Sequence, residues 1–497
     1  MAFDDLREFL AAIEREGELL RVRAEVDPVL EIGAIADRAA KGGGPALLFE
    51  RPKGSRVPVL INQFASMKRM AMALGVSSLD DLSKNLENLI EKDPPASLWE
   101  SLKHLPEFAR LARIFPRKVD DAPCQEVVKT GPQARIDDLP VITAWPGDAG
   151  PFVSLGCVFT RDPKTNRRNC GMYRLQVFDP QTLGFHSHRH HSGAEHARET
   201  PEGRKLPVAV AIGTDPAVTF SAVAPLPPGM DEMLLAGWLR GSGVAMVGCK
   251  TVPLEVPATA EIVLEGWVDP ADVRTEGPYG DHTGFYSLAD RYPTLRLSAV
   301  THRRDPIYAT TVVGAPPMED GWIGYAIERL FLPLLRKIVP EVVDYHMPWE
   351  GAFHNLVLVS IKKRHPGQAR KVMHALWGTG QAIFSKVVVV VDEWVDVRNP
   401  REAAWAALAS IDPARDMEVA HGPAETLDHA SRAVCYGSKV GFDATKKLPE
   451  EGFDRAWPEV QRHTPETTAR VRARWAELGL GHLPFPEGLL GGGRIDS

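Results

Sequence analysis

The stretch "NLVLVSIKKRHPGQARKVMHALWGTGQAIFSKVVVVVDEW", residues 355–394, decides the fold class of its part of the chain. Its first nine residues are a strand-like run, and "HPGQARKVMHALWG" follows as a helix with Pro366 expected in its first turn. "KVVVVVDEW" is almost continuously apolar, which is typical of a strand covered on both faces. A further helix, "NPREAAWAALAS", can be capped by Asn399. This order predicts a layered α/β domain with βαβ units.

Towards the N-terminus the pattern changes. From about 125 to 310, short β-rich runs alternate with Pro/Gly turns, and helical periodicity is nearly absent apart from "DEMLLAGWLRG" at 231–241. That spacing predicts an all-β barrel or sandwich. Before it, Leu6, Phe9, Leu10 and Ile13 form the stripe of an amphipathic helix ending at Gly17. A second stripe (Ile32, Ile35, Ala36, Ala39) and the strand-like runs "PALLFE" and "VPVLINQF" complete a small mixed α/β domain.

Composition limits the class of protein. A net charge of −7 argues against non-specific nucleic-acid binding. Five scattered cysteines fit a reducing compartment better than a disulfide framework. No run of 18 apolar residues occurs, and the acidic, amphipathic N-terminus resembles no signal peptide. We therefore expect a soluble, cytoplasmic protein of two to four domains.

Two candidate groups of reactive side chains lie on either side of residue 180. In "NCGMYRLQVF", Asn169 offers an amide oxygen and Arg174 a permanent positive charge. Positions five apart on a regular strand face opposite ways, so one site needs a break in the strand, and Gly171 is the expected place. "FHSHRHHSGAEH", 185–196, holds five histidines. His186, His188 and His190 alternate, so on a strand they would share one face and could ligate a metal. The alternatives are a solvated strand or histidines that bind an anion.

A third candidate is the turn "TEGPYGDHTGFYS", 275–287. Its Gly and Pro residues can fold it back and bring Glu276 and Asp281 together. Close carboxyl groups are expected to split their pKa values, one ionised and one protonated. The alternative is a surface turn with solvated acids. Glu232 lies in the predicted helix at 231–241 and can face inward. The same residue types would also serve a metallohydrolase.

The motifs "NCGMYR", "GAEH", "DEMLLAGWLRG" and "EGPYGDHTGFYS" come in the order and spacing of the UbiD family of reversible, prenylated-FMN-dependent decarboxylases, which this sequence resembles. "EVDPVLEI", "AWPGDAGP", "IKKRHPGQA", "DPARD" and "GFDATKK" extend the resemblance over nearly the whole chain. They are most similar to the ubiquinone-biosynthesis branch, which acts on 3-polyprenyl-4-hydroxybenzoate.

The resemblance implies a role for each matching position. It implies a Mn2+ site at Asn169, His190 and Glu232, with His191 as the alternative to His190, and usually a K+ ion nearby. It implies a catalytic network of Arg174, Glu276 and Asp281, with Asp281 as proton donor. It implies contacts to the cofactor from a larger set: Asn169, Met172, Tyr173, Arg174, His186, Ser187, His188, His190, His191, Ser192 and Glu232.

The resemblance also implies a multi-domain α/β architecture: an N-terminal α/β domain (1–122), a central split β-barrel of the flavin-reductase type that holds the site (123–315), a C-terminal α/β oligomerisation domain (316–455) and a helical extension (456–497). The implied function is the non-oxidative decarboxylation of 3-polyprenyl-4-hydroxybenzoate to 2-polyprenylphenol in ubiquinone biosynthesis.

The alternatives to that function are decarboxylation of a smaller acid (4-hydroxybenzoate, protocatechuate or vanillate) and, in another class, a non-catalytic cofactor-binding subunit. Implied partners are a flavin prenyltransferase, which supplies the cofactor, and further copies in a dimer or hexamer. A polyprenylated substrate would also bring peripheral contact with the inner membrane, although the sequence contains no basic amphipathic helix that would indicate such contact.

Overall fold

The computed structural model describes residues 3–90, 112–186, 192–227, 229–486 and 490. It divides into two compact units, residues 1–330 and 331–497. The four segments predicted from the sequence are not tested by this division and stay a prediction. Among the described helices, none is both long and apolar enough to cross a membrane.

The first unit begins with a four-stranded sheet of order β1-β2-β3-β18. The predicted helices are confirmed, and the stripe of the first is buried. In the second, Ile32 and Ala36 are buried but Ile35 and Ala39 are only half-buried. The elements are α1 (Leu6–Arg15), β1 (Leu19–Val26), α2 (Glu31–Lys41), β2 (Ala46–Pro52), β3 (Val59–Ile61), α3 (Met67–Ala73) and α4 (Asp80–Ile90).

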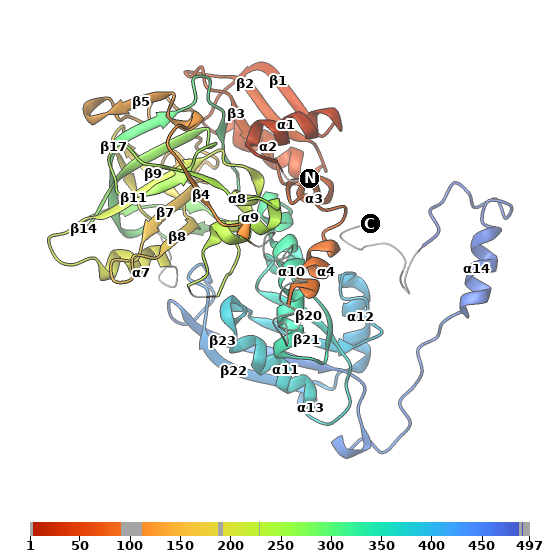
Figure 1. Ribbon diagram of the computed structural model, residues 1–497. Coiled ribbons are helices and arrows are strands. Elements are labelled where there is room, and N and C mark those ends of the chain that lie inside the picture. Colours follow the sequence, from red (N-terminus) through yellow and green to blue (C-terminus); the bar gives the residue numbers. More distant parts are fainter. Residues whose placement is uncertain (1–2, 91–111, 187–191, 228, 487–489, 491–497) are drawn as a thin grey trace, which may run out of the picture. The chain divides into compact units, whose positions relative to one another are not determined.

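The last strand of this sheet comes from a distant part of the sequence. β18 (Tyr308–Ala309) pairs in parallel with β3, so a segment beyond the β-rich region completes the N-terminal sheet. Figure 1 shows β1, β2 and β3 side by side with α1 and α2 near them.

A nine-stranded, mostly antiparallel sheet forms the middle of the first unit, with the order β6-β9-β10-β17-β14-β11-β7-β8 and β5 paired to β17. Figure 1 shows it curled into a half-barrel, as the spacing of short strands predicts. The strands are β5 (Val127–Thr130), β6 (Phe152–Val153), β7 (Cys157–Arg161), β8 (Arg168–Met172), β9 (Leu175–Asp179), β10 (Thr182–Gly184), β11 (Leu206–Ile212), β14 (Ile262–Glu276) and β17 (Asp290–His302).

The chain connectivity explains the curl. β8 ends one side of the strand order and β9 is second from the other side, yet only Tyr173 and Arg174 join them. In a flat sheet, six strand spacings of about 4.8 Å would separate β8 from β9 by roughly 29 Å. Three Cα steps of about 3.8 Å reach only roughly 11 Å. The sheet must therefore curl until its two sides meet at Tyr173 and Arg174.

Shorter elements surround this sheet. The predicted helix at 231–241 is confirmed as α9, which Gly241 ends in a left-handed conformation (φ 71°). The expectation of no other helix between 125 and 310 is wrong, because Asp215 and Pro216 start α8 as N-cap and first residue, and α7 begins within the histidine stretch at Ser192. The elements are β4 (Arg117–Val119), α7 (Ser192–Glu199), α8 (Pro216–Ser221), α9 (Glu232–Arg240), β12 (Ala245–Gly248), β13 (Glu255–Pro257), β15 (Tyr279–Gly280), β16 (Tyr286–Ser287) and the start of α10 (Glu319–Ile338).

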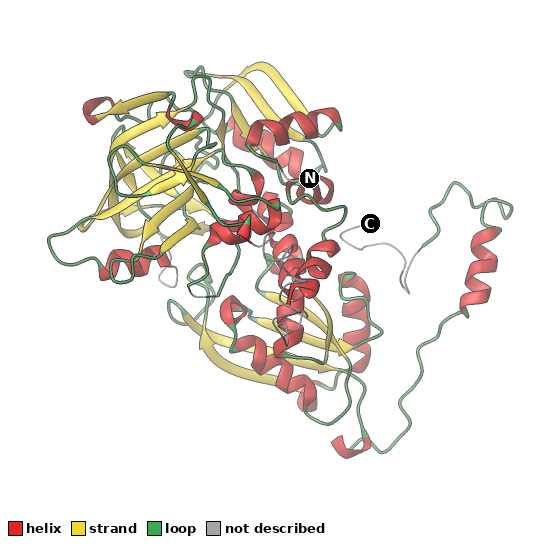
Figure 2. Ribbon diagram, viewed as in Figure 1, coloured by secondary structure: helices red, strands yellow, loops and turns green. Residues whose placement is uncertain are grey.

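The second unit is the α/β layer that residues 355–394 predict, a sheet of order β19-β20-β21-β23-β22 (Figure 2). Alternate residues of β20 face opposite layers: Val357 and Val359 pack with α11, and Leu358 packs with α12. The central strands are therefore covered on both faces, as predicted. The elements are β19 (Val342–His346), β20 (Leu356–Ile361), α11 (Gln368–Trp377), β21 (Val387–Asp392), α12 (Pro400–Ser410), α13 (Pro413–Asp416), β22 (Met417–Pro423), β23 (Tyr436–Ala444) and α14 (Pro465–Ala473).

Of the two helix starts predicted in this unit, one is confirmed and the other is wrong. Asn399 caps α12 as predicted, accepting a hydrogen bond from the N–H of Glu402. The expectation that Pro366 lies in the first turn of α11 is wrong. Gly367 adopts φ 73° as the N-cap and turns the chain, so Pro366 lies before the helix.

Candidate active site

Arg174 lies in the two-residue break between β8 and β9. The sequence predicts a break so that Asn169 and Arg174 can serve one site, but its placement at Gly171 is wrong. β8 pairs with β7 in regular register through Met172. Gly171 serves another purpose, because a Cβ there would lie 2.3 Å from the hydroxyl oxygen of Tyr173. The glycine makes room for that ring to fold back over the strand.

Arg174 holds both predicted acids. Its Nε donates to Glu276 Oε1 at 2.9 Å and its Nη2 to Glu276 Oε2 at 3.3 Å, while Nη1 donates to Asp281 Oδ2. All three side chains are buried. Glu276 is the last residue of β14, and Asp281 follows β15, so the turn does fold back and bring the two carboxyl groups together. The alternative of a solvated surface turn is wrong.

The expected split of the two carboxyl pKa values is also wrong. Burial raises the pKa of Asp281, but hydrogen bonds from His282 and the charges of His282 and Arg174 outweigh it, and the pKa falls below the usual range. Burial likewise opposes the lowering of the Glu276 pKa, which His186 and Arg174 produce. Repulsion between the two carboxylates does not set their pKa values, because the positively charged guanidinium of Arg174 lies between them.

Several residues of this network carried no sequence signal of their role. Ser287 Oγ accepts from Arg174 Nη2 at 3.0 Å, and the Tyr279 ring lies 4.7 Å from the guanidinium carbon. Asp281 Oδ1 accepts from the backbone N–H of His282 at 2.8 Å and lies 3.0 Å from its Nδ1. Asp148, in the "AWPGDAGP" motif, accepts from the N–H of Gly280 at 2.7 Å and so anchors the turn. All four residues lie in motifs quoted above, and this position was the only indication in the sequence that they belong to the site.

Two of the three predicted metal ligands lie together. Glu232 is the first residue of α9, and its Oε2 accepts from the N–H of Cys170, next to Asn169 in β8. Burial raises the Glu232 pKa to about 7, and the neighbouring charge of Asp231 adds to this. A nearby cation would stabilise the ionised form of such a buried carboxyl group. The Glu232 carboxylate and the Asn169 amide oxygen therefore fit a metal ion. The predicted third ligand, His190, lies outside the described residues.

The Tyr173 hydroxyl connects this pair to the start of α7. It accepts from Asn169 Nδ2 and from the N–H of Gly193, both at 3.3 Å. Ser192, a predicted cofactor contact, is the first residue of α7, where backbone N–H groups favour an anion. Met172, another predicted contact, ends β8 and is half-buried.

The histidine stretch is only partly described. His186 follows β10 rather than lying in a strand, and its Nδ1 is 2.8 Å from Glu276 Oε2, so this imidazole joins the acid–arginine network. Ser187, His188, His190 and His191 lie outside the described residues. His196, for which the sequence indicated no role, is buried in α7, with Nδ1 2.9 Å from Thr160 Oγ1 on β7. The described residues contain no cluster of three or more His, Cys, Asp or Glu side chains able to hold a metal. Asn169 is none of these residue types, and His190 lies outside the described residues.

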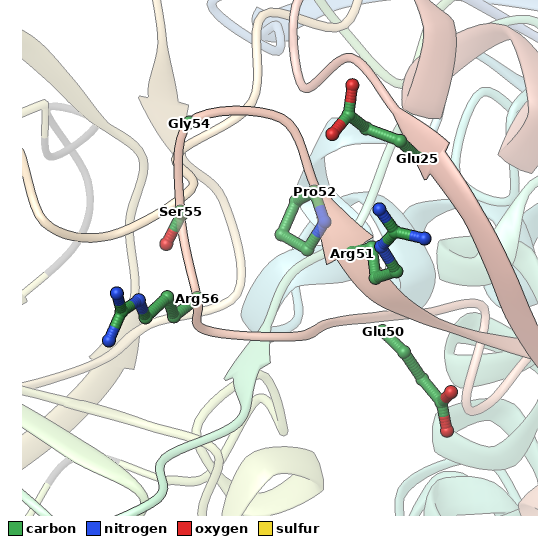
Figure 3. Close-up of a pocket in the computed structure, with 7 residues that line it drawn as sticks. All are labelled: Glu25, Glu50, Arg51, Pro52, Gly54, Ser55 and Arg56. Carbon is green, nitrogen blue, oxygen red and sulfur yellow. The ribbon is translucent and has the colours of Figure 1, made fainter.

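A pocket lies apart from this network, at the turn after β2 (Figure 3). Glu25, Glu50, Arg51 and Arg56 contribute side chains of both charges to it, and Glu50 also pairs with Arg21. No buried charged group faces this pocket among its lining residues. We therefore place the candidate site at Arg174.

Comparison with known proteins identifies the family of the chain. Three family models match the chain: the N-terminal domain of 3-octaprenyl-4-hydroxybenzoate carboxy-lyase at residues 10–89, its Rift-related domain at 117–316, and its C-terminal domain at 321–444. The Rift-related match contains every candidate site residue. An uncharacterized protein of Archaeoglobus fulgidus is 48% identical over 481 residues, which is 96% of this chain and 99% of that protein.

Solved structures support the same relationship. Vanillic acid decarboxylase of Sedimentibacter hydroxybenzoicus, in closed form, is 30% identical with a TM-score of 0.84, covering 96% of this chain and 99% of that one. The UbiD-class enzyme HmfF of Pelotomaculum thermopropionicum, in complex with FMN, is 33% identical with a TM-score of 0.76, covering 91% and 97%. An evolved dimeric form of HmfF is in complex with prFMN. Matches to all three domains, relatives of this identity and a shared fold over almost the whole length show that the chain belongs to the UbiD family of carboxy-lyases.

Proposed function

We propose that this protein is a prenylated-FMN-dependent decarboxylase of an aromatic carboxylic acid. The observation that carries the proposal is the buried Arg174, which Glu276 and Asp281 hold. It lies in the same two-residue break as Tyr173, whose hydroxyl contacts Asn169. The presence of all three catalytic candidates argues against the non-catalytic subunit. The vanillic acid decarboxylase relative favours a small aromatic acid, while the matching family models are named for the polyprenylated one. Both substrates therefore enter the test.

Arg174 has a donor left for the substrate. Of its five N–H groups, Glu276, Asp281 and Ser287 take four, and one N–H of Nη1 has no acceptor within the described residues. The acids fix the plane of the guanidinium, so this N–H points in a defined direction and can orient a substrate carboxylate. Asp281 is the group that we propose protonates the ring carbon after CO2 leaves.

The cofactor set follows the same residues. Asn169, Glu232 and His190, with His191 as the alternative, would hold Mn2+, which neutralises the flavin phosphate, and K+ would bind nearby. Tyr173, Ser192, Met172, His186 and the histidine stretch would line the flavin. Bound prenylated FMN supplies the electron sink that no side chain offers. A flavin prenyltransferase would supply it, and we expect a dimer or hexamer.

The test is reconstitution with prenylated FMN, Mn2+ and K+. We would measure CO2 release and ring H/D exchange with vanillate, protocatechuate, 4-hydroxybenzoate and a 3-polyprenyl-4-hydroxybenzoate. Release with at least one acid is expected, and none with any of them would contradict the proposal. Asp281→Asn should keep the flavin and lose turnover by about 10²–10⁴-fold. Normal turnover in that variant would remove Asp281 as the proton donor.

The metal assignment has its own test. Asn169→Ala and Glu232→Ala should each bind less Mn2+ and less flavin, because the phosphate loses its counter-charge. Metal content by mass spectrometry and flavin absorbance after gel filtration measure both. Glu255→Ala removes an acid that pairs with Arg168 at 2.9 Å and serves as the control. Full metal and flavin content in the first two variants would sink the assignment.

A further inference from the structure

The proposed reaction sets a problem of proton supply. Decarboxylation replaces a C–CO2⁻ bond by a C–H bond, so each turnover consumes one proton. Asp281 is buried, and its neighbours hold it in the ionised form. A buried carboxylate that gives up a proton in every cycle must be reloaded through a group that it already contacts.

His282 is that contact. Its Nδ1 lies 3.0 Å from Asp281 Oδ1, and its backbone N–H donates to the same oxygen. The side chain of His282 is 20% exposed, twice as much as that of Asp281 at 10%. An imidazole can take a proton at one ring nitrogen and release one from the other, which suits it to connect a buried acid with its surroundings.

Asp320 is a further acid close enough to His282 for the two charges to interact. It is the second residue of α10, and the loop before that helix packs on the turn that carries Asp281, since a Cβ at Gly284 would lie 3.0 Å from the Cα of Ala315. The Trp145 indole N–H, which donates to Val313 at 2.9 Å, fixes the same loop. Asp320 is partly exposed, but its Oδ2 is inaccessible and has no hydrogen-bond partner among the described residues. A water molecule between the carboxyl group and its neighbours would satisfy that atom.

The charges around Asp320 suit a proton store. Burial raises its pKa to about 7; the charge of His282 lowers it, while those of Asp281 and Glu319 raise it. The charge of Asp320 also raises the pKa of Tyr279. Asp320 is thus an acid that changes protonation near neutral pH, within electrostatic reach of both His282 and Asp281.

We propose that His282 and Asp320 form the relay that returns a proton to Asp281 after each turnover. Asp281 gives its proton to the ring carbon, on the electron pair left by the departing CO2. His282 then passes its Nδ1 proton to Asp281, and Asp320 passes a proton through water to the second ring nitrogen. Solvent reprotonates Asp320, so that one proton enters for each CO2 released. The relay rests on the proposed function; both residues are positioning residues, because they act through Asp281.

The experiment compares the reconstituted wild type with Asp320→Asn and His282→Asn, using the acid that the wild type decarboxylates. Asp305→Asn, at an exposed site, and His302→Asn, at a half-buried one, are the matched controls. We expect a fall in kcat of about 10–100-fold in both relay variants, KM within about twofold, and a larger solvent isotope effect on kcat. Asp320→Glu should recover part of the rate. Unchanged kcat in Asp320→Asn overturns the relay, and so does a raised KM with unchanged kcat, which would mean that Asp320 binds substrate instead.

A second measurement does not depend on activity. In the protein with labelled histidines, NMR titration should show that Asp320→Asn lowers the pKa of the His282 imidazole, because a neighbouring negative charge is lost. The His282→Asn spectrum assigns the signal. No change in that pKa overturns the relay even if the enzyme is active. Conversely, the wild type could prove inactive while Asp320→Asn still lowers the pKa of His282. That result would contradict the proposed function and leave the electrostatic coupling standing.

Discussion

Arg174 shows how one residue sets the chemistry of its neighbours. Two acids this close would ordinarily compete for a proton, and the second would stay protonated. The guanidinium between Glu276 and Asp281 removes that competition, and His186 and His282 stabilise the ionised forms further. The resting site therefore holds a negative carboxylate where a proton donor is required. That is why a route for proton supply matters here.

Asp320 gives a prediction about stability and pH. The unfolded chain loses this proton near pH 4, but the folded protein keeps it to about pH 7. Between those values the folded state binds more protons, so this residue's contribution to stability is lost as pH rises. Asp320→Asn should therefore gain stability relative to the wild type by about 1–2 kcal/mol between pH 5 and pH 8, a figure reduced for its partial exposure.

Thermal unfolding of both proteins at pH 5 and pH 8 measures this difference. Any fixed effect of the new amide cancels, because only the change with pH is compared. Asp305→Asn, at an exposed position, should show no such change. An equal difference between Asp320→Asn and the wild type at both values would contradict the burial argument.

At the scale of elements, the join between β8 and β9 positions the site. The strand stays regular through Met172, and then two residues carry the chain to the other side of the sheet. Tyr173 turns back over Gly171 towards Asn169, while Arg174 turns towards the end of β14. The same join therefore places Arg174, which holds both acids, only five residues after the predicted metal ligand Asn169.

Gly171→Ala tests this element. The new Cβ would meet the Tyr173 hydroxyl at 2.3 Å, so the ring must move and loosen its contacts with Asn169 and Gly193. We expect a loss of about 1–3 kcal/mol in unfolding free energy and weaker flavin binding. Gly248→Ala, at the end of β12 with nothing within 4 Å of its Cβ, is the control and should be neutral. Similar behaviour of the two variants would mean that the Tyr173 position does not matter.

At the scale of the whole molecule, the two described units are each completed by long-range pairing. In the first unit, β18 joins β3 across about half of the chain, with the N–H of Tyr308 donating to Pro58 at 2.9 Å. The last strand of the N-terminal sheet thus lies beyond the half-barrel in the sequence. The stability of this sheet therefore depends on β18, which lies outside the first 120 positions of the sequence.

Tyr308→Ala should expose this dependence. The side chain is completely buried, so the change should cost about 3–5 kcal/mol. Because β18 ends the N-terminal sheet, hydrogen exchange should rise in β3 and β2 before it rises in β21 of the second unit. Tyr436→Ala, at a 53% exposed position, is the control and should change little. Exchange that rises equally in both units would contradict a local role for this strand.

The sequence by itself determined the periodic elements and the residue types of the site. The amphipathic stripe of α1, the apolar runs of β20 and β21, and the Asn399 cap each follow from local spacing. The turn of 275–287 also followed, because Gly permits the positive φ angles that a turn needs and Pro fixes φ locally. The family motifs indicated which side chains to expect, and the comparisons confirm the family.

Only the tertiary structure decided how those side chains act on one another. The break at Tyr173 and Arg174 rather than Gly171, and the ionised state of both acids, depend on contacts between residues far apart in sequence. Spacing along a chain fixes which face a residue occupies, but protonation depends on burial and on charges brought close by folding. That physical difference is why the residues of this site could be predicted and their electrostatics could not.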